Sequence, residues 1–486
     1  MKLRLILPQL DKELLDSFGN IEIKGISCNS QSVSNDYIFV AIRGTKLDAN
    51  RFIYDAINKG ARIIISDSIE SFSQSKKAVF IKVKDCRETL SKIAANFYGR
   101  PSEKIKVIGI TGTNGKTTIS YLLENILQKA GFDVGVIGTI NYRFKNRLIP
   151  AINTTPGPLE IQSLLNSMLK EKLKYAVMEV SSHSLDQKRV LHVNFQSAIF
   201  TNLTAEHLDY HPNLENYFQA KAKLFKNLNK TACAIVNLDD KYAKELIKIT
   251  PADVLTYGII HKDADVRAEE LCLTIDGAKF KLITKDCISE IKTDLVGKHN
   301  VYNILAAISL ALAEKIDLNI IRQAIEGFKG VPGRLEEVKS GLNFRVFVDF
   351  AHTPDALKNV LTSLKEFNPA RIILVFGCGG DRDRIKRPLM GKIASCMADF
   401  SIITSDNPRS EDPQSIADQI IQGMSSKDYK IILDRKEAIK EALSLARKDD
   451  LVLIAGRGHE AYQVFKDITI AFDDRQEVKN ILECLK

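Results

Sequence analysis

The chain has 486 residues, of which 45% are hydrophobic and 27% charged, a composition typical of globular proteins. This length predicts about three domains, and no apolar run is long enough to cross a membrane. The eight cysteines are scattered without a Cys-x-x-Cys pair, which argues against a disulfide framework or a zinc site and favours a reducing cytosol. The net charge of +9 is spread without a dense basic tract, so we expect no nucleic-acid partner.

The N-terminal part predicts a small α/β unit. The first apolar block is too short for a signal peptide, because the charged residues 11–13 follow it, and we expect a cytoplasmic protein. Apolar runs predict strands at residues 21–26, 37–42 and 62–66, and residues 52–58 predict a helix. Pro101-Ser102 marks a boundary, so residues 1–102 are assigned to a first domain.

A phosphate-binding loop follows. The β-branched run at residues 107–111 predicts a strand that leads into Gly-Thr-Asn-Gly-Lys-Thr-Thr (residues 112–118). Apolar residues at 119, 122, 123, 126 and 127 predict a helix that stops near Gly131. Strand, loop and helix N-terminus together form a cradle for phosphates, in which Lys116 faces the terminal phosphates and Thr117 suits Mg²⁺. The two glycines are closer than in the common motif, and the alternative is an ordinary strand–helix turn.

Strands and helices alternate through the rest of the chain. Strands are predicted at residues 134–140, 175–180, 196–203 and 233–237, with a helix at 158–170. Gly327 to Gly333 marks a second boundary, after which strands are predicted at 344–349, 371–376, 400–404 and 451–455. This pattern predicts mostly parallel, doubly wound sheets, whose ligands bind at the carboxyl ends of the strands. The second domain is assigned to residues 103–331 and the third to 332–486.

Some polar residues at these strand ends carry chemistry. Glu179 ends a buried strand and either holds Mg²⁺ or faces solvent. His207 is either a metal ligand or a hydrogen-bonded structural histidine. Lys221 lies in a predicted amphipathic helix of ordinary pattern. Its lysines form a solvated face unless one of them has a further role. In the last third, arginines of the loops at 377–384 and 406–409 could grip a carboxylate, and Glu460 could receive an ammonium; the alternative is turn chemistry and surface charge.

A set of short polar and glycine-rich motifs runs through the chain. They are Gly-Thr-Asn-Gly-Lys-Thr-Thr (112–118), Asn-Thr-Thr-Pro (153–156), Met-Glu-Val-Ser-Ser-His (178–183), Gln-Lys-Arg (187–189), Thr-Asn-Leu-Thr-Ala-Glu-His-Leu-Asp-Tyr-His (201–211), Gly-Lys-His-Asn-Val-Tyr-Asn (297–303), Gly-Arg-Leu-Glu (333–336), Asp-Phe-Ala-His-Thr-Pro (349–354), Asp-Asn-Pro-Arg (406–409) and Gly-Arg-Gly-His-Glu (456–460). With these motifs in this order the chain resembles the Mur ligase family, most closely its diaminopimelate-adding members, and the resemblance runs from Ser30 to Arg475.

The resemblance implies three α/β domains and one reaction. The first domain would bind the UDP moiety, the second would be a P-loop ATPase, and the Rossmann-like third would bind the incoming amino acid. ATP would activate the glutamyl carboxylate of UDP-N-acetylmuramoyl-L-alanyl-D-glutamate as an acyl phosphate, which the amine of meso-diaminopimelate would attack. Mg²⁺ is the implied cofactor. The resemblance also implies peptidoglycan synthesis, hence roles in cell shape and division, and a monomer without membrane insertion.

The resemblance also assigns roles by position. The catalytic set is Lys116, Glu179, His207 and Lys221, and the metal set is Thr117, Glu179, His207 and Lys221, the last as a carbamylated lysine. The nucleotide would contact Gly112, Thr113, Asn114, Gly115, Lys116, Thr117, Thr118, Asn300, Arg334 and Asp349. The UDP-substrate would contact Ser30, Asn153, Thr154, Thr155, Ser181, Gln187 and Arg189. Diaminopimelate would contact Arg382, Asp406, Asn407, Pro408, Arg409, Gly456 and Glu460.

Arg409 favours diaminopimelate over lysine as the amino acid. Its guanidinium suits a side chain that ends in a second carboxylate, and a lysine substrate would leave it unpaired. Three motifs depart from the family pattern, namely Asn29-Ser30-Gln31 in place of Asp-Ser-Arg, Asp48-Ala49 in place of Asp-Gly, and Arg457 in place of Lys, and they weaken the assignment of uridine contacts. The rival readings are a folate polyglutamylating ligase, which typically lacks the N-terminal unit, and a P-loop ATPase acting as a switch.

Overall fold

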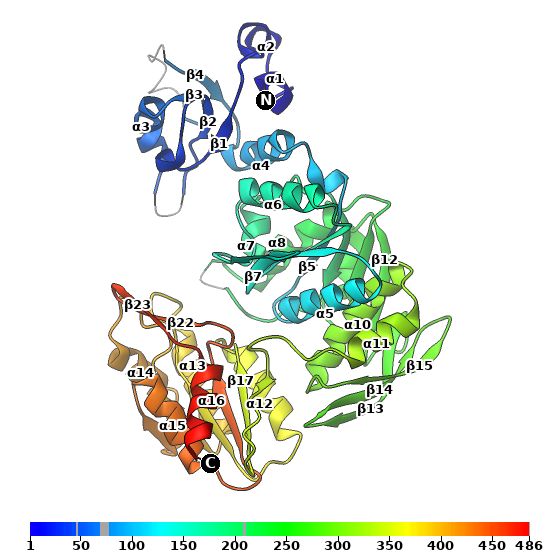
Figure 1. Ribbon diagram of the computed structural model, residues 1–486, viewed down its shortest axis with the longest axis vertical. Coiled ribbons are helices and arrows are strands. Elements are labelled where there is room, and N and C mark those ends of the chain that lie inside the picture. The colour runs from blue at the N-terminus through cyan, green and yellow to red at the C-terminus, as the bar shows by residue number, and fades with distance from the viewer. Residues whose placement is uncertain (45–46, 69–76, 208–209, 486) are drawn as a thin grey trace.

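The computed structural model describes residues 1–44, 47–68, 77–207 and 210–485. Within these residues the chain forms three α/β units in sequence order, each built on its own sheet, and a small hairpin near the C-terminus (Figure 1). The predicted α/β class is therefore confirmed. Leu208 and Asp209, which belong to the motif at residues 201–211, lie outside the described residues.

The N-terminal unit is a parallel sheet of four described strands in the order β1-β2-β3-β4. Its elements are α1 (Leu3–Ile6), α2 (Lys12–Phe18), β1 (Gly25–Ser27), η1 (Ser30–Ser32), β2 (Tyr37–Val40), η2 (Ala49–Phe52), α3 (Ile53–Asn58), β3 (Ala61–Ser66), β4 (Val79–Lys82), α4 (Cys86–Phe97) and η3 (Pro101–Glu103). The strand predicted at 21–26 is mostly wrong. Backbone groups of Ile21 and Ile23 bond instead to Leu3 and Met1, at 2.9 and 2.8 Å, which leaves a short β1.

The central unit holds a sheet of 11 described strands in the order β15-β14-β13-β12-β11-β10-β5-β9-β6-β7-β8. Its strands are β5 (Lys106–Thr111), β6 (Val134–Ile137), β7 (Asn141–Phe144), β8 (Arg147–Pro150), β9 (Tyr175–Glu179), β10 (Phe195–Phe200), β11 (Cys233–Asn237), β12 (Asp253–Gly258), β13 (Val266–Thr274), β14 (Gly277–Ile283) and β15 (Ile288–Thr293). Its helices are α5 (Lys116–Lys129), α6 (Pro158–Lys170), α7 (Ser182–Asp186), α8 (Leu214–Lys226), α9 (Ala243–Ile249), α10 (Lys298–Ala313) and α11 (Leu318–Glu326).

This central sheet is parallel from β13 to β6 and antiparallel at both ends. The antiparallel strands β13, β14 and β15 were not predicted, although Asp276-Gly277 between β13 and β14 is a dipeptide typical of hairpin turns. The predicted strands at the parallel centre are confirmed, because those strands are buried on both faces and read as continuous apolar runs.

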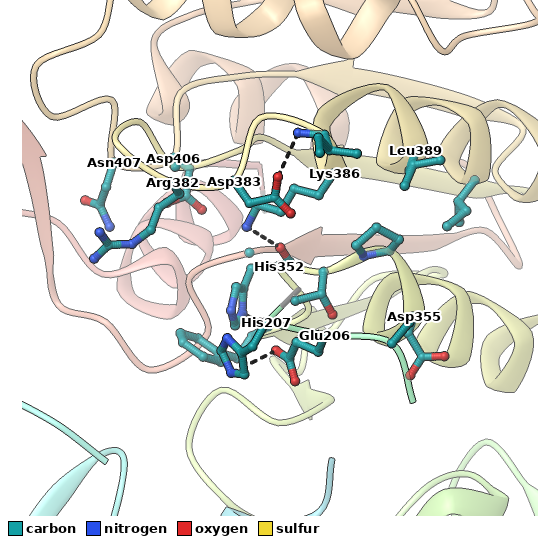
Figure 2. A pocket seen from close by; sticks show the side chains of 18 of the residues that line it. Glu206, His207, His352, Asp355, Arg382, Asp383, Lys386, Leu389, Asp406 and Asn407 are labelled. Atoms are coloured by element: carbon teal, nitrogen blue, oxygen red, sulfur yellow. Dashed lines mark hydrogen bonds and ion pairs between the residues drawn. The ribbon is translucent and has the colours of Figure 1, made fainter. Parts of the chain in front are cut away.

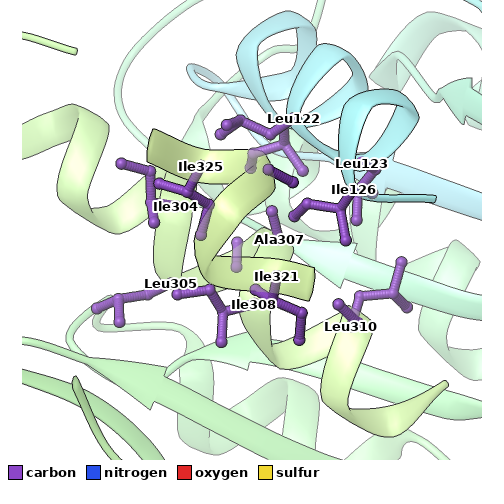
Figure 3. Packing of buried hydrophobic residues seen from close by; sticks show 14 of the residues in the cluster. Leu122, Leu123, Ile126, Ile304, Leu305, Ala307, Ile308, Leu310, Ile321 and Ile325 are labelled. Atoms are coloured by element: carbon purple, nitrogen blue, oxygen red, sulfur yellow. The ribbon is translucent and has the colours of Figure 1, made fainter. Parts of the chain in front are cut away.

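Helices α5, α10 and α11 cover one face of the central sheet. Apolar side chains at helical spacing on α5, among them Leu122 and Ile126, pack against Ile304 and Ile308 of α10 and against Ile325 of α11 (Figure 3). All are fully buried, so each contributes on the order of 2 kcal/mol to folding by leaving water. The packing fixes α5, and with it the loop that precedes α5.

The C-terminal unit holds six described strands in the order β16-β17-β21-β18-β19-β20, parallel except for β16. Its elements are β16 (Glu336–Glu337), β17 (Arg345–Asp349), α12 (Pro354–Lys365), β18 (Ile372–Phe376), α13 (Lys386–Met397), β19 (Phe400–Ile403), α14 (Pro413–Ile421), β20 (Tyr429–Ile431), α15 (Arg435–Leu445), β21 (Leu451–Ala455), the hairpin β22 (Tyr462–Phe465) and β23 (Ile468–Ala471), and α16 (Asp474–Leu485). Alternate residues of β18 belong to different cores: Ile372 and Leu374 to one, Ile373 and Val375 to the other.

The order of the central strands brings three distant segments to one edge. Strand β5 lies between β10 and β9, and all three are parallel. Their carboxyl ends therefore place the loop at residues 112–118, the segment after Phe200 and the side chain of Glu179 side by side. In the described part of the chain, no helix is both long enough and apolar enough to cross a membrane.

Candidate active site

The glycine loop between β5 and α5 is held tightly against the segment that follows β10. The φ of Gly112 is +147°, and a Cβ there would lie 1.8 Å from Oγ1 of Thr201. The φ of Gly115 is +90°, and a Cβ would lie 2.3 Å from Oδ1 of Asn303. Only glycine fits both places. Asn202 then fixes the loop between them, because its carbonyl and its side-chain oxygen accept the backbone N–H groups of residues 113 and 114, both at 2.9 Å.

Lys116 lies at the first position of α5 and is folded over the loop. Its Nζ donates to the carbonyl oxygens of Gly112 (2.9 Å) and Thr113 (2.8 Å). Burial lowers the pKa of this ammonium, and Glu206 and Glu179 oppose that effect through their charge. A half-buried ammonium whose hydrogen bonds within the described chain go to neutral carbonyls suits a phosphate.

Glu179 ends β9 and is 1% exposed. Its Oε2 accepts from Oγ1 of Thr117 (3.0 Å) and Oγ1 of Thr139 (2.8 Å), while its Oε1 accepts from the backbone N–H of Thr139 (3.0 Å). Thr117 also receives a bond from Nη2 of Arg334 at 3.3 Å. The structure thus joins two members of the expected metal set. Thr139 was not predicted as a site residue. It could have been identified from its position just after β6, the strand that lies beside β9.

Lys221 lies on α8 and is 1% exposed, so the alternative of a solvated lysine is wrong. Its Nζ donates to the carbonyl of Gly112 at 2.8 Å and lies 4.5 Å from the ring centre of Tyr217. Burial lowers the pKa of Lys221 well below its ordinary value, and the charge of Lys116 lowers it further, whereas Glu206 opposes both. Lys221 is therefore a buried amine under the phosphate loop that gains little from carrying a proton.

His207 lies at the border between two cavities and has a φ of +56°. Its ring centre is 4.8 Å from that of His183, and its Nε2 is 3.9 Å from Oε1 of Glu206. Glu206 lies within the motif at residues 201–211 and had no predicted role, yet its charge opposes the lowering of the pKa of both Lys116 and Lys221. The structure thus adds a carboxylate to the expected group.

The phosphate loop opens into a cavity of about 360 Å³. The residues expected at the nucleotide that line it are Thr113, Asn114, Gly115, Lys116, Thr117, Thr118, Asn300, Arg334 and Asp349. Asp349 accepts the backbone N–H groups of Leu335 (2.5 Å) and Ala351 (2.7 Å), and burial raises its pKa against the effect of Arg334. A cavity of about 280 Å³ continues behind Asn114 and is lined by Asp239, Tyr257 and Tyr302, none of which was predicted.

Most residues expected at the UDP-substrate gather beside the end of β9. Thr155 donates to the carbonyl of Glu179 (2.8 Å) and accepts the backbone N–H of Ser181 (3.0 Å). Nε and Nη2 of Arg189 hold Oε1 of Gln187 at 3.0 and 2.7 Å, and Nη1 of Arg189 donates to the carbonyl of Thr155 at 2.8 Å. In the preceding loop, Oγ1 of Thr154 lies 3.1 Å from Oγ1 of Thr139, and the carbonyl of Asn153 accepts from Tyr142. Ser30 is in the N-terminal unit, buried at the start of η1.

A larger cavity of about 730 Å³ lies between the end of the central sheet and the C-terminal unit. In Figure 2, Arg382, Asp406 and Asn407 line one side, and Glu206 and His207 line the opposite side. Five residues line both this cavity and the nucleotide cavity, namely Glu206, His207, Phe350, His352 and Thr353. A ligand in the large cavity would therefore face a nucleotide bound at the phosphate loop.

The polar end of the large cavity presents both charges. Nη1 of Arg409 donates to the carbonyl oxygen of Gly380 (2.8 Å), and Nδ2 of Asn407 donates to Oε2 of Glu460 (2.8 Å). Burial raises the pKa of Glu460, and the charge of Asp406 raises it further. Cations and carboxylates in one pocket suit an amino acid that carries charges at both ends. The expected residues Arg382, Asp406, Asn407, Arg409, Gly456 and Glu460 all line it, and Pro408 lies between Asn407 and Arg409 with its carbonyl against Gly380.

The hairpin β22–β23 supports this end and was not predicted. Nε2 of Gln463 donates to the carbonyl of Asp406 at 2.7 Å, and the backbone N–H of Val464 donates to Oδ1 of Asn407 at 2.8 Å. Arg457, which departs from the family pattern, is fully buried. It donates to the carbonyl of Tyr462, the first residue of β22, and to the carbonyl of Phe472, directly after β23. The arginine is thus a fixed part of the frame around the loop at residues 406–409.

Among the described residues, no three His, Cys, Asp or Glu side chains are grouped closely enough to hold a metal ion by themselves. Thr117, in the first turn of α5, and Glu179, at the end of β9, offer oxygen atoms that are hydrogen-bonded to each other. Magnesium prefers oxygen ligands and usually binds through one or two carboxylates together with substrate phosphates. The donor set at the phosphate loop fits that mode of binding.

The chain is similar to known proteins over nearly its whole length. The family description "Mur ligase middle domain" matches residues 110–311, "Mur ligase, glutamate ligase domain" matches 333–458, and "Mur ligase family, catalytic domain" matches 22–98. Proteins named UDP-N-acetylmuramoyl-L-alanyl-D-glutamate--2,6-diaminopimelate ligase are 44% identical in Clostridium tetani, over 99% of both chains, and 43% identical in Clostridium botulinum, over 99% of this chain and 100% of that one. A solved structure titled with the same ligase name is 33% identical, with a TM-score of 0.72 over 100% of this chain and 99% of that chain. The chain belongs to the Mur ligase family.

Proposed function

We propose that the protein is an ATP-dependent ligase that joins meso-diaminopimelate to the glutamyl carboxylate of UDP-N-acetylmuramoyl-L-alanyl-D-glutamate, a step of peptidoglycan precursor synthesis. The observation that carries this proposal is the pair of adjoining cavities: the phosphate loop with Lys116 lines one, and the other is a pocket of mixed charge. The full-length similarity to ligases of that name supports the choice of substrates.

The reaction requires an anion to attack an anion. A glutamyl oxygen attacks the γ-phosphorus of ATP, the bond to the β–γ bridging oxygen breaks, and ADP leaves with an acyl phosphate formed. Lys116 and Arg334 would offset the repulsion, because both are half-buried cations that line the nucleotide cavity. The substrate amine then attacks the acyl carbon, loses a proton and expels phosphate. Oxygen donors Thr117 and Glu179, with His207, would hold Mg²⁺, which neutralises phosphate charge when bound.

Lys221 would act as a carbamate. Its neutral amine, favoured by the lowered pKa, adds to the carbon of CO₂ and releases one proton, which leaves an anionic N-carboxylysine. The change converts repulsion between Lys221 and Lys116 into attraction, and it supplies a carboxylate that suits a second Mg²⁺. The burial of Lys221 beneath the loop, with Nζ 2.8 Å from the carbonyl oxygen of Gly112, supports a position for that group beside the phosphates.

Three domains would deliver the substrates. Residues 1–102 would hold the UDP moiety through Ser30, residues 103–331 would bind ATP, and residues 332–486 would bind the amino acid. The dipeptide would extend along Asn153, Thr154 and Thr155 and the segment containing Ser181, Gln187 and Arg189. Asn300 and Asp349 would serve the nucleotide, and Arg409 the distal carboxylate of diaminopimelate.

The direct test is phosphate release from ATP in the presence of UDP-muramoyl dipeptide and either meso-diaminopimelate or lysine. We expect release that depends on the dipeptide and on diaminopimelate, with formation of the tripeptide product. If phosphate is released with neither diaminopimelate nor lysine, the ligase proposal is overturned. Release with lysine alone would keep the ligase reaction and overturn the role given to Arg409.

A further inference from the structure

One carboxylate of the C-terminal unit reaches the phosphate loop of the central unit. Asp355 lies in the first turn of α12, where the helix dipole favours a negative charge. Its Oδ2 accepts from Nδ2 of Asn114 in the loop (3.0 Å) and from Oγ1 of Thr204 (2.9 Å). Asn359, one turn further along α12, donates to the same oxygen at 3.1 Å and fixes the orientation of the carboxylate.

Further polar contacts extend from Thr204 to the helix that carries Lys221. Thr204 bonds through its backbone N–H to Oγ1 of Thr113 (3.1 Å), which lies 3.3 Å from the hydroxyl of Tyr217. Lys221 lies above the ring of Tyr217. A single chain of polar contacts therefore connects the first turn of α12, the phosphate loop and the helix that carries Lys221.

The position of Asp355 also links the cavities. Asp355 lines the large cavity (Figure 2). Asn114 and Asn359 line the nucleotide cavity. Since Oδ2 already accepts three donors, its hydrogen-bonding capacity is used within the protein. The contact thus belongs to the wall between the two ligands, and it joins the two units at the place where amine and acyl phosphate must meet.

We propose that Asp355 is a positioning residue, which holds the amino-acid-binding unit in register with the phosphate loop. The inference rests on the proposed ligase function for its kinetic consequence. Removal of the carboxylate would leave Asn114 and Thr204 without their acceptor and free the first turn of α12 from the loop. The aligned approach of two bound reactants then deteriorates, which reduces turnover even when all substrates are saturating.

Four variants test the proposal: Asp355→Ala, Asp355→Asn, Thr204→Val and the double variant of Asp355→Ala with Thr204→Val. Asp276→Ala is the matched control, because Asp276 also crosses between the two units, as an 80% exposed partner of Arg345 at 2.7 Å, but contacts neither cavity. We expect Asp355→Ala to lower kcat by about tenfold to a hundredfold, as for a lost bond to a charged group. Asp355→Asn, which retains a carbonyl acceptor, should restore most of kcat, and Asp276→Ala should keep it.

The double variant and a second measurement separate the possible outcomes. We expect the effects of Asp355→Ala and Thr204→Val to be less than multiplicative, because the two residues share one contact. Amide hydrogen exchange of residues 112–118 and 201–206 should quicken in Asp355→Ala and stay unchanged in Asp276→Ala. A defect confined to the KM of diaminopimelate, or an unchanged kcat with unchanged exchange, would overturn the proposal. If exchange quickens in Asp355→Ala but the wild-type protein itself shows no ligase activity, the contact is supported and the proposed function is refuted instead.

Discussion

Replacing Lys221 separates the role of this side chain in the reaction from its role in the fold. Lys221→Met keeps a long side chain but removes the buried amine. The substitution loses one hydrogen bond, from Nζ to the carbonyl of Gly112, which is worth about 1 kcal/mol. It also removes a polar amine from a buried site where burial disfavours its charged form, which offsets the loss. We therefore expect the melting temperature to change by no more than a few degrees.

Turnover should respond very differently. Without the amine the proposed carbamate could not form, and the site would lose the preorganised anion that it would supply beside Mg²⁺ and the phosphates. Loss of one such group lowers kcat by about a hundredfold to a thousandfold, equivalent to about 2.7–4 kcal/mol. Phosphate release at saturating substrates, measured beside thermal unfolding of the same preparation, gives both quantities. The Lys221→Met protein should be folded and almost inactive.

A second substitution at the same position distinguishes the carbamate from a simple cation. Lys221→Ala opens space under the loop, so acetate or formate should restore part of the activity, whereas Lys221→Met fills that space and should not respond. Full turnover of the folded Lys221→Met protein would refute the catalytic assignment. Lack of any response of Lys221→Ala to small carboxylates, at unchanged ATP binding, would refute the carbamate.

Three further predictions follow from other contacts. Arg409→Ala should raise the KM of diaminopimelate at least tenfold and leave that of ATP nearly unchanged, since Arg409 lines only the larger of the two principal described cavities; equal effects on both would indicate misfolding. Burial lowers the pKa of His299 to about 4 from an ordinary 6.5, so folding keeps the imidazole neutral. The associated stability is present above pH 6.5 and is lost as the pH falls toward 4. Denaturant titrations across this pH range should show a smaller loss of unfolding free energy in His299→Gln than in the wild type. Asp474→Ala should cost roughly 3–5 kcal/mol of unfolding free energy, because it leaves fully buried Arg435 without the carboxylate 2.7 Å away; a melting temperature within a degree of wild type would contradict this.

Some expectations at the active site needed only the sequence. The phosphate loop is predicted by a local pattern, because a strand, closely spaced glycines, Lys116 and an amphipathic helix are contiguous in the chain. Glu179 and the segment after residue 200 could be placed near it, since buried runs predict parallel strands whose carboxyl ends share an edge. The family resemblance then named partners such as Lys221, for which local residue chemistry indicated only a solvated helix face.

Other features depend on contacts between segments far apart in the chain. The hairpin that supports Asp406 is only weakly apolar and has exposed residues such as Ile468, so its pattern does not distinguish it from a loop. The part played by Asp355 is equally hidden, because its partners Asn114 and Thr204 lie 241 and 151 residues away.

The sequence by itself determined the α/β class, the order of the units and the phosphate loop, because periodicity and turn chemistry are local properties of the chain. Only the tertiary structure decided that Lys221 is buried beside Lys116, that two cavities share a wall, and that a carboxylate from α12 bonds to the loop. Burial and proximity arise when separate elements pack, and packing sets the dielectric surroundings and hydrogen-bond partners on which the chemistry of these side chains depends.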